Sequence, residues 1–405
     1  MLTRRALSYL HMMATDLPTL PTELIEQIFD SLVLRRGESH VTFPDRHSLF
    51  TCALASRAFS ATAKARLYRD LQLSYSVDEG LASASWNGPS SSAVVANRAL
   101  VRTARLVVGI RAYASEGPGV DRALAHFLRN MFREDFALDG CAVDFGGWHP
   151  GPLAIAAMRE RLLGPALRRL SVIQLVGSSS VMRLLQDCAS LEELAFRKLQ
   201  PVELDVALSL QRLRIECDET TDNGPFTTLT SSSFTSLTHL TLTLRPPSSP
   251  VSTIYPLDSF RSLRELHLRP ADITDASWTS FFTSAARIRH PTLEALTLSS
   301  PYPFSTLSRA RALTTHRLLH HLPTTLRQIE LAHVPIELDY LLDFFRGATP
   351  NAWRNLVLGG AIVFGCNRRA GAEVYAEVRA AAGKRGLQVE SGAELVKCFC
   401  DGNGL

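Results

Sequence analysis

One short leucine pattern recurs along the chain, and this recurrence limits the possible folds more than any other feature. The pattern is Leu-x-x-Leu-x-Leu or a close variant, and eight copies lie between residues 167 and 360. Their starting points differ by 24, 19, 27, 26, 30, 33 and 27 residues. One structural unit therefore recurs along this part of the chain. The copies begin at Leu167, Leu191, Leu210, Leu237, Leu263, Leu293, Leu326 and Trp353.

Each copy is expected to form a short β-strand. Successive side chains of a strand point to opposite faces, so the fourth and sixth residues of a copy share one face and the third, fifth and seventh share the other. A single unit cannot bury its apolar face, whereas a stack of units can. The sequence therefore predicts stacked parallel strands, connected by helices expected over residues 179–190, 275–288, 314–322 and 337–348.

The spacing resembles that of leucine-rich-repeat proteins, whose units span roughly 20–29 residues. This resemblance implies an α/β solenoid with a parallel sheet on its concave face and helices outside. Two fainter copies begin at Val101 and Leu138. A helix ending near Gly383 or Gly386, followed by a strand, is expected to cap the stack. We assign the solenoid to residues 100–392 and a tail to 393–405; an α/β domain without repeats is the alternative.

The repeats are irregular at their ninth position, which is Leu175, Leu199 and Asp218 in three of the copies. Without a regular asparagine there, the turns lack a recurring side-chain partner, and we expect irregular curvature. Two Ser/Thr-rich segments, at residues 218–236 and 245–259, are expected to project as loops.

A different pattern begins the chain, in the stretch LPTELIEQIFDSL from Leu20 to Leu32. Pro21 suits the first position of a helix, and Glu23 suits its first turn. An apolar stripe at helical spacing follows. Further helical patterns after Asp45 give three short helices over residues 16–73, preceded by a leader at 1–15 and followed by a linker at 74–99. A transit segment is the alternative for residues 1–15.

The stretch from Leu20 to Leu32, followed by SLFTCALASRAFSATAKARLY from Ser48 to Tyr68, resembles the F-box, and the style is similar to that of fungal F-box proteins. The resemblance implies binding to a Skp-type linker protein, and through it to a cullin. Two departures are a long segment at residues 33–47 and a phenylalanine where tryptophan is common. The alternative is a helical cap that packs Leu20, Ile28 and Leu49 against the first repeat. The residues implied to bind the linker are Leu20, Pro21, Leu24, Ile28, Leu32, Leu49, Cys52 and Phe59.

The third, fifth and seventh positions of the repeats are the expected ligand-binding surface. From the first copy to the seventh they hold five arginines and four glutamates, a mixed charge that suits a protein ligand better than a phosphorylated motif. The candidate ligand-binding residues are Arg169, Arg197, Arg212, Arg214, His239, His267 and Arg269. The glutamates are Glu193, Glu216, Glu265 and Glu330.

No catalytic or metal-binding pattern is found, so no cofactor is expected. The three histidines of residues 316–321 lack the glutamate and the further ligands of a zinc motif. A net charge of +4 over 405 residues is too small to indicate nucleic-acid binding. No apolar stretch is long enough to suggest a membrane partner. Seven scattered cysteines favour reduced thiols, and hence the cytoplasm or the nucleus.

These patterns lead to one hypothesis about function. The chain is expected to be a non-catalytic substrate receptor of a Skp–cullin–F-box ubiquitin ligase, with the F-box on the linker protein and the repeats on an unknown protein substrate. A repeat scaffold that works without the ligase is the alternative.

Overall fold

A computed structural model describes residues 24, 27, 33–34, 43–44, 51, 57–78, 84–87, 90–111, 118–132, 136–174, 183–185, 188–199, 208–217, 235–244, 260–270, 292–299, 319, 322, 325–332, 335–347, 353–359, 362–364 and 371–391. The chain divides into two compact units, Met1–Leu167 and Arg168–Leu405. Both are built from parallel strands and helices, so the fold class is α/β.

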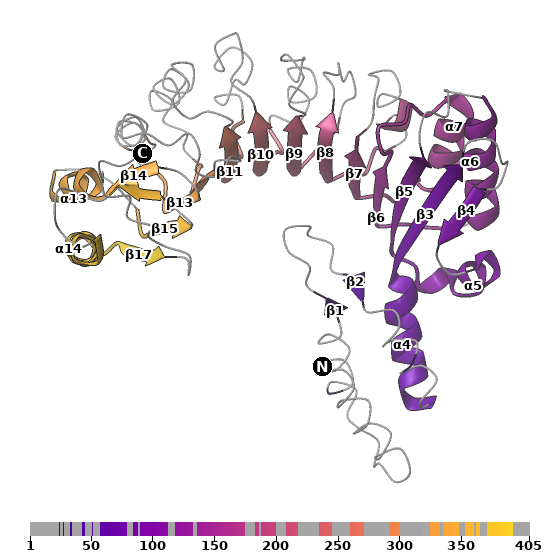
Figure 1. Ribbon diagram of the computed structural model, residues 1–405, viewed down its shortest axis with the longest axis horizontal. Coiled ribbons are helices and arrows are strands. Elements are labelled where there is room, and N and C mark those ends of the chain that lie inside the picture. Colours follow the sequence, from indigo (N-terminus) through magenta and orange to yellow (C-terminus); the bar gives the residue numbers. More distant parts are fainter. Residues whose placement is uncertain are drawn as a thin grey trace, which may run out of the picture. The chain divides into compact units, whose positions relative to one another are not determined.

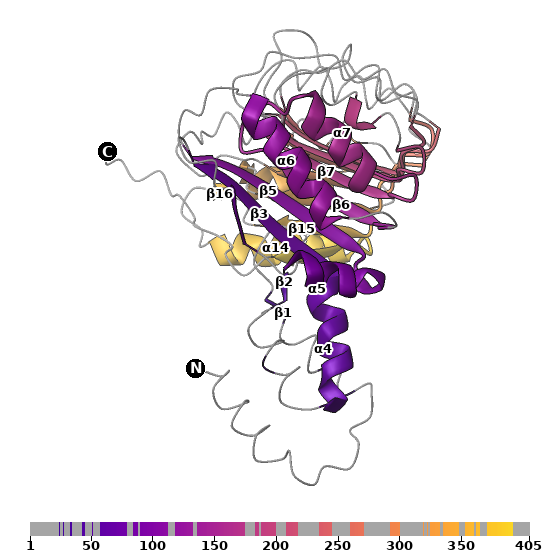
Figure 2. The ribbon, with the colours of Figure 1, turned by 90° about the vertical axis from the view of Figure 1, so that its right-hand side faces the viewer.

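The first unit is organised around helix α4 (Arg57–Arg69) and strand β3 (Asp70–Asp78), which follows it without an intervening residue. Strand β5 (Thr103–Arg111) pairs parallel with β3, and β6 (Gly140–Asp144) pairs parallel with β5. Strand β4 (Ala84–Asn87) pairs antiparallel with β3. In Figures 1 and 2, α4 extends away from the end at which β3 begins.

Among its described residues, this unit has four further helices, and two of them, α6 and α7, lie side by side (Figure 2). They are α5 (Ser91–Ala96), the 3-10 helix η1 (Arg98–Leu100), α6 (Pro118–Met131) and α7 (Pro152–Arg161). A short antiparallel pair, β1 (Val33–Leu34) with β2 (Phe43–Pro44), lies within the segment expected to separate the first two helices.

Strand β3 has the burial pattern of a repeat strand. Leu71, Leu73 and Tyr75 are buried, whereas the residues between them are half-buried. The backbone N–H of Arg102 donates to the carbonyl of Arg69 over 2.9 Å. The stack of strands in this unit therefore starts directly after α4.

The domain boundaries predicted around residue 73 differ from the structure. The predicted linker at 74–99 contains the end of β3, all of β4 and α5, and part of η1. The physical reason is that β3 lacks the first leucine of the pattern, since Tyr68 stands three residues before Leu71. The sequence therefore predicts residues 70–73 as part of the preceding helical region instead of the sheet.

The three-helix arrangement expected over residues 16–73 is described only in part. Helix α4 corresponds to the third expected helix. Leu24, Gln27 and Thr51 have helical backbone conformation. Most of residues 16–56 lie outside the described residues, so the bundle stays a prediction.

The second unit contains nine parallel strands among its described residues, and Figure 1 shows β7 to β11 side by side and pointing the same way. The strands are β7 (Arg169–Ile173), β8 (Glu193–Leu199), β9 (Arg212–Cys217), β10 (His239–Leu244), β11 (Glu265–Pro270), β12 (Ala295–Ser299), β13 (Gln328–Ala332), β15 (Asn355–Gly359) and β17 (Gln388–Ser391). Two short strands, β14 (Pro335–Glu337) and β16 (Ile362–Phe364), form a separate parallel pair.

The register aligns the repeats position by position, as the sequence predicts. One row of paired residues is Leu194, Leu213, Leu240, Leu266, Leu296, Ile329, Leu356 and Val389. A second row, two residues further along each strand, is Phe196, Ile215, Leu242, Leu268, Leu298, Leu331 and Leu358. All of these side chains are buried, as are the first-position residues from Leu191 to Trp353. Each repeat thus contributes three residues to one continuous core.

The C-terminal cap agrees with the expectation. Helix α14 (Gly371–Gly383) is followed by β17, the last strand of the row. Gly386 has φ +73° in the turn between them, a conformation that glycine adopts without steric cost. Helix α13 (Leu338–Arg346) lies within the expected range 337–348 and packs beside α14.

The other expected helices are described only in part. Residues 183–185 and Leu319 are helical, and residues 275–288 lie outside the described residues. The curvature expected of the sheet stays a prediction as well. Within the described part of the chain, no helix combines the length and the apolar character needed to cross a membrane.

Tyr75 connects the sheet of the first unit to α6. Its ring lies 4.9 Å from that of Phe127, centroid to centroid. Burial raises the pKa of the Tyr75 hydroxyl, because the charged form loses water. The side chain therefore acts as a neutral aromatic core residue.

Asp121 fixes α7 against α6. Its side chain is 7% exposed, and its two carboxylate oxygens accept the backbone N–H groups of Leu153 and Ala154, each over 2.9 Å. These N–H groups lie in the first turn of α7, whose N-cap residue, Gly151, has no side chain to satisfy them. A Cβ atom on Gly151 would lie 2.6 Å from the Asp121 carboxylate. The glycine thus admits a capping group from another helix.

Replacement of this carboxylate should destabilise the first unit. We expect Asp121→Ala to lower the free energy of unfolding by about 1–3 kcal/mol, because two N–H groups lose their acceptor. Urea denaturation of the full chain measures this. Arg122→Ala, an exposed neighbour on the same helix, should change it by less than about 0.5 kcal/mol. Equal effects of the two variants would show that the cap contributes nothing specific.

Candidate functional site

The candidate site is the face of the second unit's sheet opposite to its apolar rows. We call this the polar face, and define it as the third, fifth and seventh residues of each repeat, counted from the first residue of the leucine pattern. The third-position row contains Arg169, Glu193, Arg212, His239, Glu265, Ala295, Gln328, Asn355 and Gln388. The fifth-position row contains Ser171, Ala195, Arg214, Thr241, His267, Thr297, Glu330, Val357 and Glu390.

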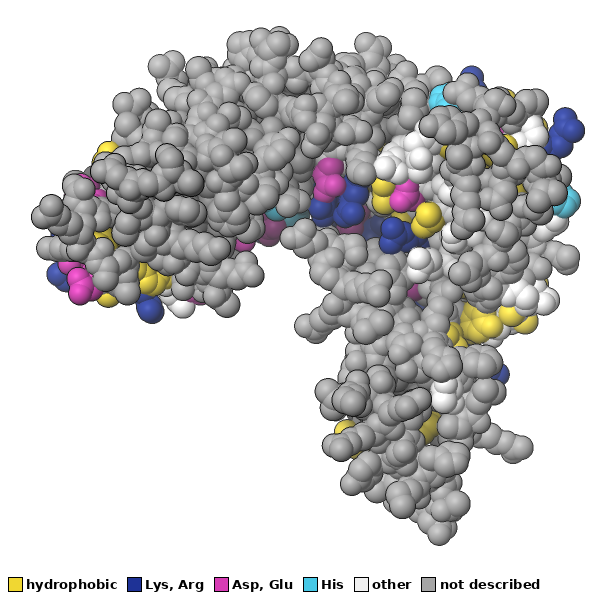
Figure 3. Space-filling view, in the orientation of Figure 1, with side chains coloured by type: hydrophobic (Ala, Val, Ile, Leu, Met, Phe, Trp, Pro, Cys, Tyr) yellow, Lys and Arg dark blue, Asp and Glu magenta, His cyan; other side chains and the backbone are white. Residues whose placement is uncertain are grey.

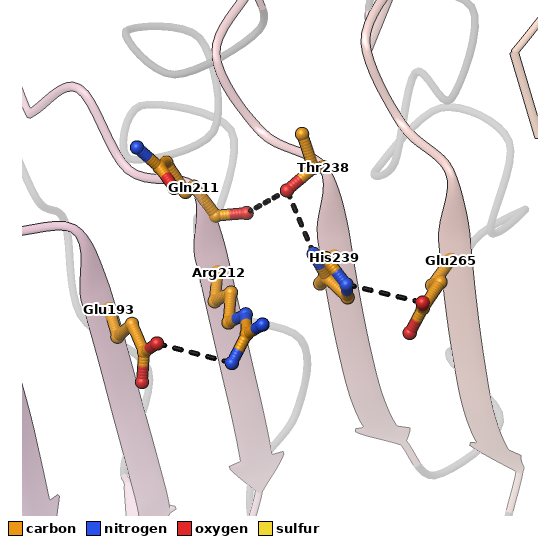
Figure 4. Close-up of polar contacts among 6 residues, drawn as sticks. All are labelled: Glu193, Gln211, Arg212, Thr238, His239 and Glu265. Atoms are coloured by element: carbon orange, nitrogen blue, oxygen red, sulfur yellow. Dashed lines mark hydrogen bonds and ion pairs between the residues drawn. The ribbon is translucent and has the colours of Figure 1, made fainter.

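Ion pairs between neighbouring strands connect the start of this face. Arg212 of β9 lies 3.2 Å from Glu193 of β8, which is its partner in the strand register (Figure 4). The Arg212 side chain is 58% exposed. Because solvent screens an ion pair as exposed as this one, the pair contributes little to stability. Its guanidinium is therefore available to a ligand at small cost.

A second group of charges lies further along β8 and β9. Glu216 accepts a hydrogen bond from Nε of Arg214 over 2.6 Å, and its other oxygen lies 3.6 Å from Nε of Arg197. One carboxylate is therefore placed between two guanidinium groups. Glu216 is 21% exposed, so this group is more shielded from water than the Arg212 pair.

The middle of the face has a histidine between two polar partners. Nδ1 of His239 lies 2.8 Å from Oγ1 of Thr238, which donates to the carbonyl of Gln211. Nε2 of His239 lies 3.3 Å from Glu265 (Figure 4). The ring is therefore held in one orientation across β9, β10 and β11.

The structure places the sequence-predicted ligand residues on this face, including Arg169, Arg197 and Arg214, together with Arg212, His239 and His267. His267 on β11 lies 3.1 Å from the hydroxyl of Ser299 on β12. Arg269 is in β11, and its side chain lies outside the described residues. Whether these residues bind a ligand stays a prediction.

Two of the predicted linker-binding residues are described. Leu24 is 45% exposed, and Phe59 is half-buried in α4. The others, Leu20, Pro21, Ile28, Leu32, Leu49 and Cys52, lie outside the described residues. The packing that would distinguish an F-box from a cap is therefore not described.

Sequence reasoning missed how the charges are divided along the polar face. Strands β7 to β9 carry four arginines and two glutamates, and Figure 3 shows basic and acidic side chains gathered near these strands. The polar-face positions of β11, β12, β13, β15 and β17 hold three glutamates and one arginine, namely Glu265, Glu330, Glu390 and Arg269. Five arginines and four glutamates, counted together from the first copy to the seventh, give an evenly mixed charge. Sorting the same residues by repeat would have revealed the division.

No family model matches the sequence, and no curated protein matches it. Among the described residues, no group of three or more His, Cys, Asp or Glu side chains is arranged to hold a metal ion. Cys141 and Cys188 are buried and are not joined in a disulfide.

The shared carboxylate should contribute to stability. We expect Glu216→Gln to lower the free energy of unfolding by about 1 kcal/mol, because two guanidinium groups lose a charged acceptor in a partly shielded position. Urea denaturation measures the change. The control is Glu265→Gln, at a carboxylate that is 58% exposed, for which screening predicts less than about 0.5 kcal/mol. A control effect as large as that of Glu216→Gln would contradict this interpretation.

Proposed function

We propose that this protein is a non-catalytic substrate receptor of a Skp–cullin–F-box ubiquitin ligase. In this proposal the N-terminal helices bind the Skp-type linker protein, and the polar face binds a protein substrate. The proposal rests on the F-box-like residues from Leu20 to Tyr68 and on the leucine-rich-repeat pattern that follows them.

The observation that carries the proposal is the direct connection of α4 to β3. No residue separates the two elements, so there is no flexible linker between the last F-box-like helix and the first strand. Two contacts tie the junction to the next strand: Arg102 N–H to the Arg69 carbonyl, over 2.9 Å, and Thr103 Oγ1 to Asp70 Oδ1, over 2.5 Å. A receptor that acts by positioning benefits from such a junction, because flexibility there would spread the bound substrate over a larger volume.

The proposed mechanism is an increase in effective concentration. A substrate held by the repeats meets the charged conjugating enzyme as if in an intramolecular reaction. The receptor supplies no reacting group. Within the first unit, the α4–β3 junction contributes by fixing the direction of α4 relative to the first strand.

The second candidate is a repeat scaffold that works without the ligase. The pairing of Val33–Leu34 with Phe43–Pro44 favours it, because this pair occupies the long segment at 33–47 that departs from the F-box pattern. In that case the N-terminal helices would cap the repeats, and no linker protein would bind.

Co-purification with a Skp-type linker protein tests the proposal. The full chain should retain the linker, and both Leu20→Ala/Pro21→Ala and Leu24→Ala should weaken retention about tenfold or more, since a buried leucine at an interface contributes a few kcal/mol.

Leu153→Ala is the matched control. Leu153 is a leucine at the start of another helix, and its exposed fraction, 42%, is close to that of Leu24, 45%. This variant should retain the linker like the wild type. A folded wild type that binds no linker would reject the ligase proposal in favour of the scaffold. Equal losses of linker retention in Leu24→Ala and Leu153→Ala would reject it as well.

A further inference from the structure

We propose that β7 to β9 of the polar face bind an extended acidic segment of a protein, whose aspartate or glutamate carboxylates meet Arg169 and Arg212. We call Arg169, Arg197, Arg212 and Arg214, with Glu193 and Glu216, the basic patch. As an identification of substrate chemistry this rests on the proposed function, although the binding itself does not require the ligase.

The basic patch contains more N–H donors than carboxylate acceptor sites. Each guanidinium has five N–H donors, so four arginines bring about twenty, whereas two carboxylates offer about eight acceptor sites. At Arg212, Glu193 accepts from Nη1 alone, and the side chain is 58% exposed, so other donors of this guanidinium can reach a ligand. The formal charge of the patch is four arginines against two glutamates, a net +2.

The charge of the polar face changes beyond the basic patch. Strand β10 presents His239, Thr241 and Thr243 on the same face, none with a permanent charge. Beyond it come Glu265 and Arg269, on β11, and then the glutamates of β13 and β17, so three glutamates stand against one arginine. An acidic ligand is attracted at β7 to β9 and repelled further along the face. The division of charge thus positions the ligand as well as attracting it.

The distance between the backbones of Arg169 and Arg212 matches a spacing of three residues in an extended peptide. Arg169 and Arg212 both lie in the third-position row, on β7 and β9, with Glu193 of β8 between them. Two inter-strand steps of about 4.8 Å separate their backbones by about 10 Å, the length of about three residues of extended chain at 3.4 Å each. A peptide that crosses the strands would therefore bring acidic residues at positions i and i+3 to the two arginines.

The two glutamates of the patch favour carboxylates over phosphates. Glu193 and Glu216 already pair with guanidinium groups here, so the site accommodates singly charged carboxylates. A phosphate, with nearly twice the charge, suits arginines without intervening carboxylates. A nucleic-acid backbone is disfavoured for the same reason, because its closely spaced phosphates would meet both glutamates.

Fluorescence anisotropy with the full chain tests this inference. The probe is a short labelled Gly-Ser peptide with glutamates at positions i and i+3. Its Kd should rise about tenfold or more in Arg169→Gln/Arg212→Gln, as expected for the loss of charged hydrogen bonds. The Arg327→Gln/Arg354→Gln variant removes the same charge from two exposed arginines of later repeats and should bind like the wild type.

Three further peptides complete the test. Placing the glutamates at i and i+1, or replacing them by glutamine, should weaken binding by a similar factor, and a phosphoserine version should bind no more tightly than the glutamate peptide. Equal binding by the glutamine peptide, or equal losses in the two double variants, would overturn the proposal. Tighter binding of the phosphoserine peptide or of a single-stranded RNA would also overturn it.

Linker co-purification of Arg169→Gln/Arg212→Gln separates this inference from the proposed function. Retention of the linker with loss of the peptide supports both. Peptide binding by a wild type that retains no linker supports the patch and rejects the ligase. Linker retention by a wild type that does not bind the peptide rejects the patch alone.

Discussion

The apolar side chains at the first, fourth and sixth positions of each repeat are the constraint on which the second unit depends. Burying one leucine contributes roughly 1.5–3 kcal/mol. No single repeat contains enough such residues to be stable alone, and each gains its core from its neighbours. The register follows from this, because a slip of one residue would turn Leu240 and Leu242 to the opposite face. Leu194 therefore pairs with Leu213, and the same alignment continues to Val389.

This constraint leaves the third and fifth positions free to carry chemistry. Backbone and core fix where each strand lies, so a polar side chain on the opposite face can change without altering the fold. Arginines on β7 to β9 and glutamates on later strands are variations of this kind. Because the rows are in register, charges far apart in sequence become neighbours: Glu193 and Arg212, 19 residues apart, form an ion pair.

Much of the second unit could be predicted because its repeats are explicit in the sequence. The strand positions, the inward rows, α13, and the final helix and strand all follow from periods of two and 3.6. The first unit was harder. The first position of the β3 repeat is Tyr68 instead of leucine, and the predicted linker at 74–99 is built mostly of strands and helices. Asp121, which caps a helix 31 residues further on, leaves no local pattern.

The polar face shows a second limit of sequence reasoning. The period of two predicts that the arginines of β7 to β9 lie on this face. The difference in charge between the two ends of the face depends on which strand each residue occupies. Pairing details such as Glu216 between Arg197 and Arg214 depend on rotamers that no spacing rule supplies. The predicted linker-binding residues are a different case, because Leu20 and Ile28 lie outside the described residues. Their role stays a prediction.

Helix α4, the described end of the F-box-like region, continues into strand β3 without a hinge. Amide hydrogen exchange of the full chain, followed by mass spectrometry over residues 57–78, tests this continuity most directly. If α4 and β3 form one cooperative unit, the last turn of α4 will be protected together with Asp70–Asp78 and will open with them. Rapid exchange over residues 66–72 beside a protected remainder of β3 would reveal a hinge and contradict the account.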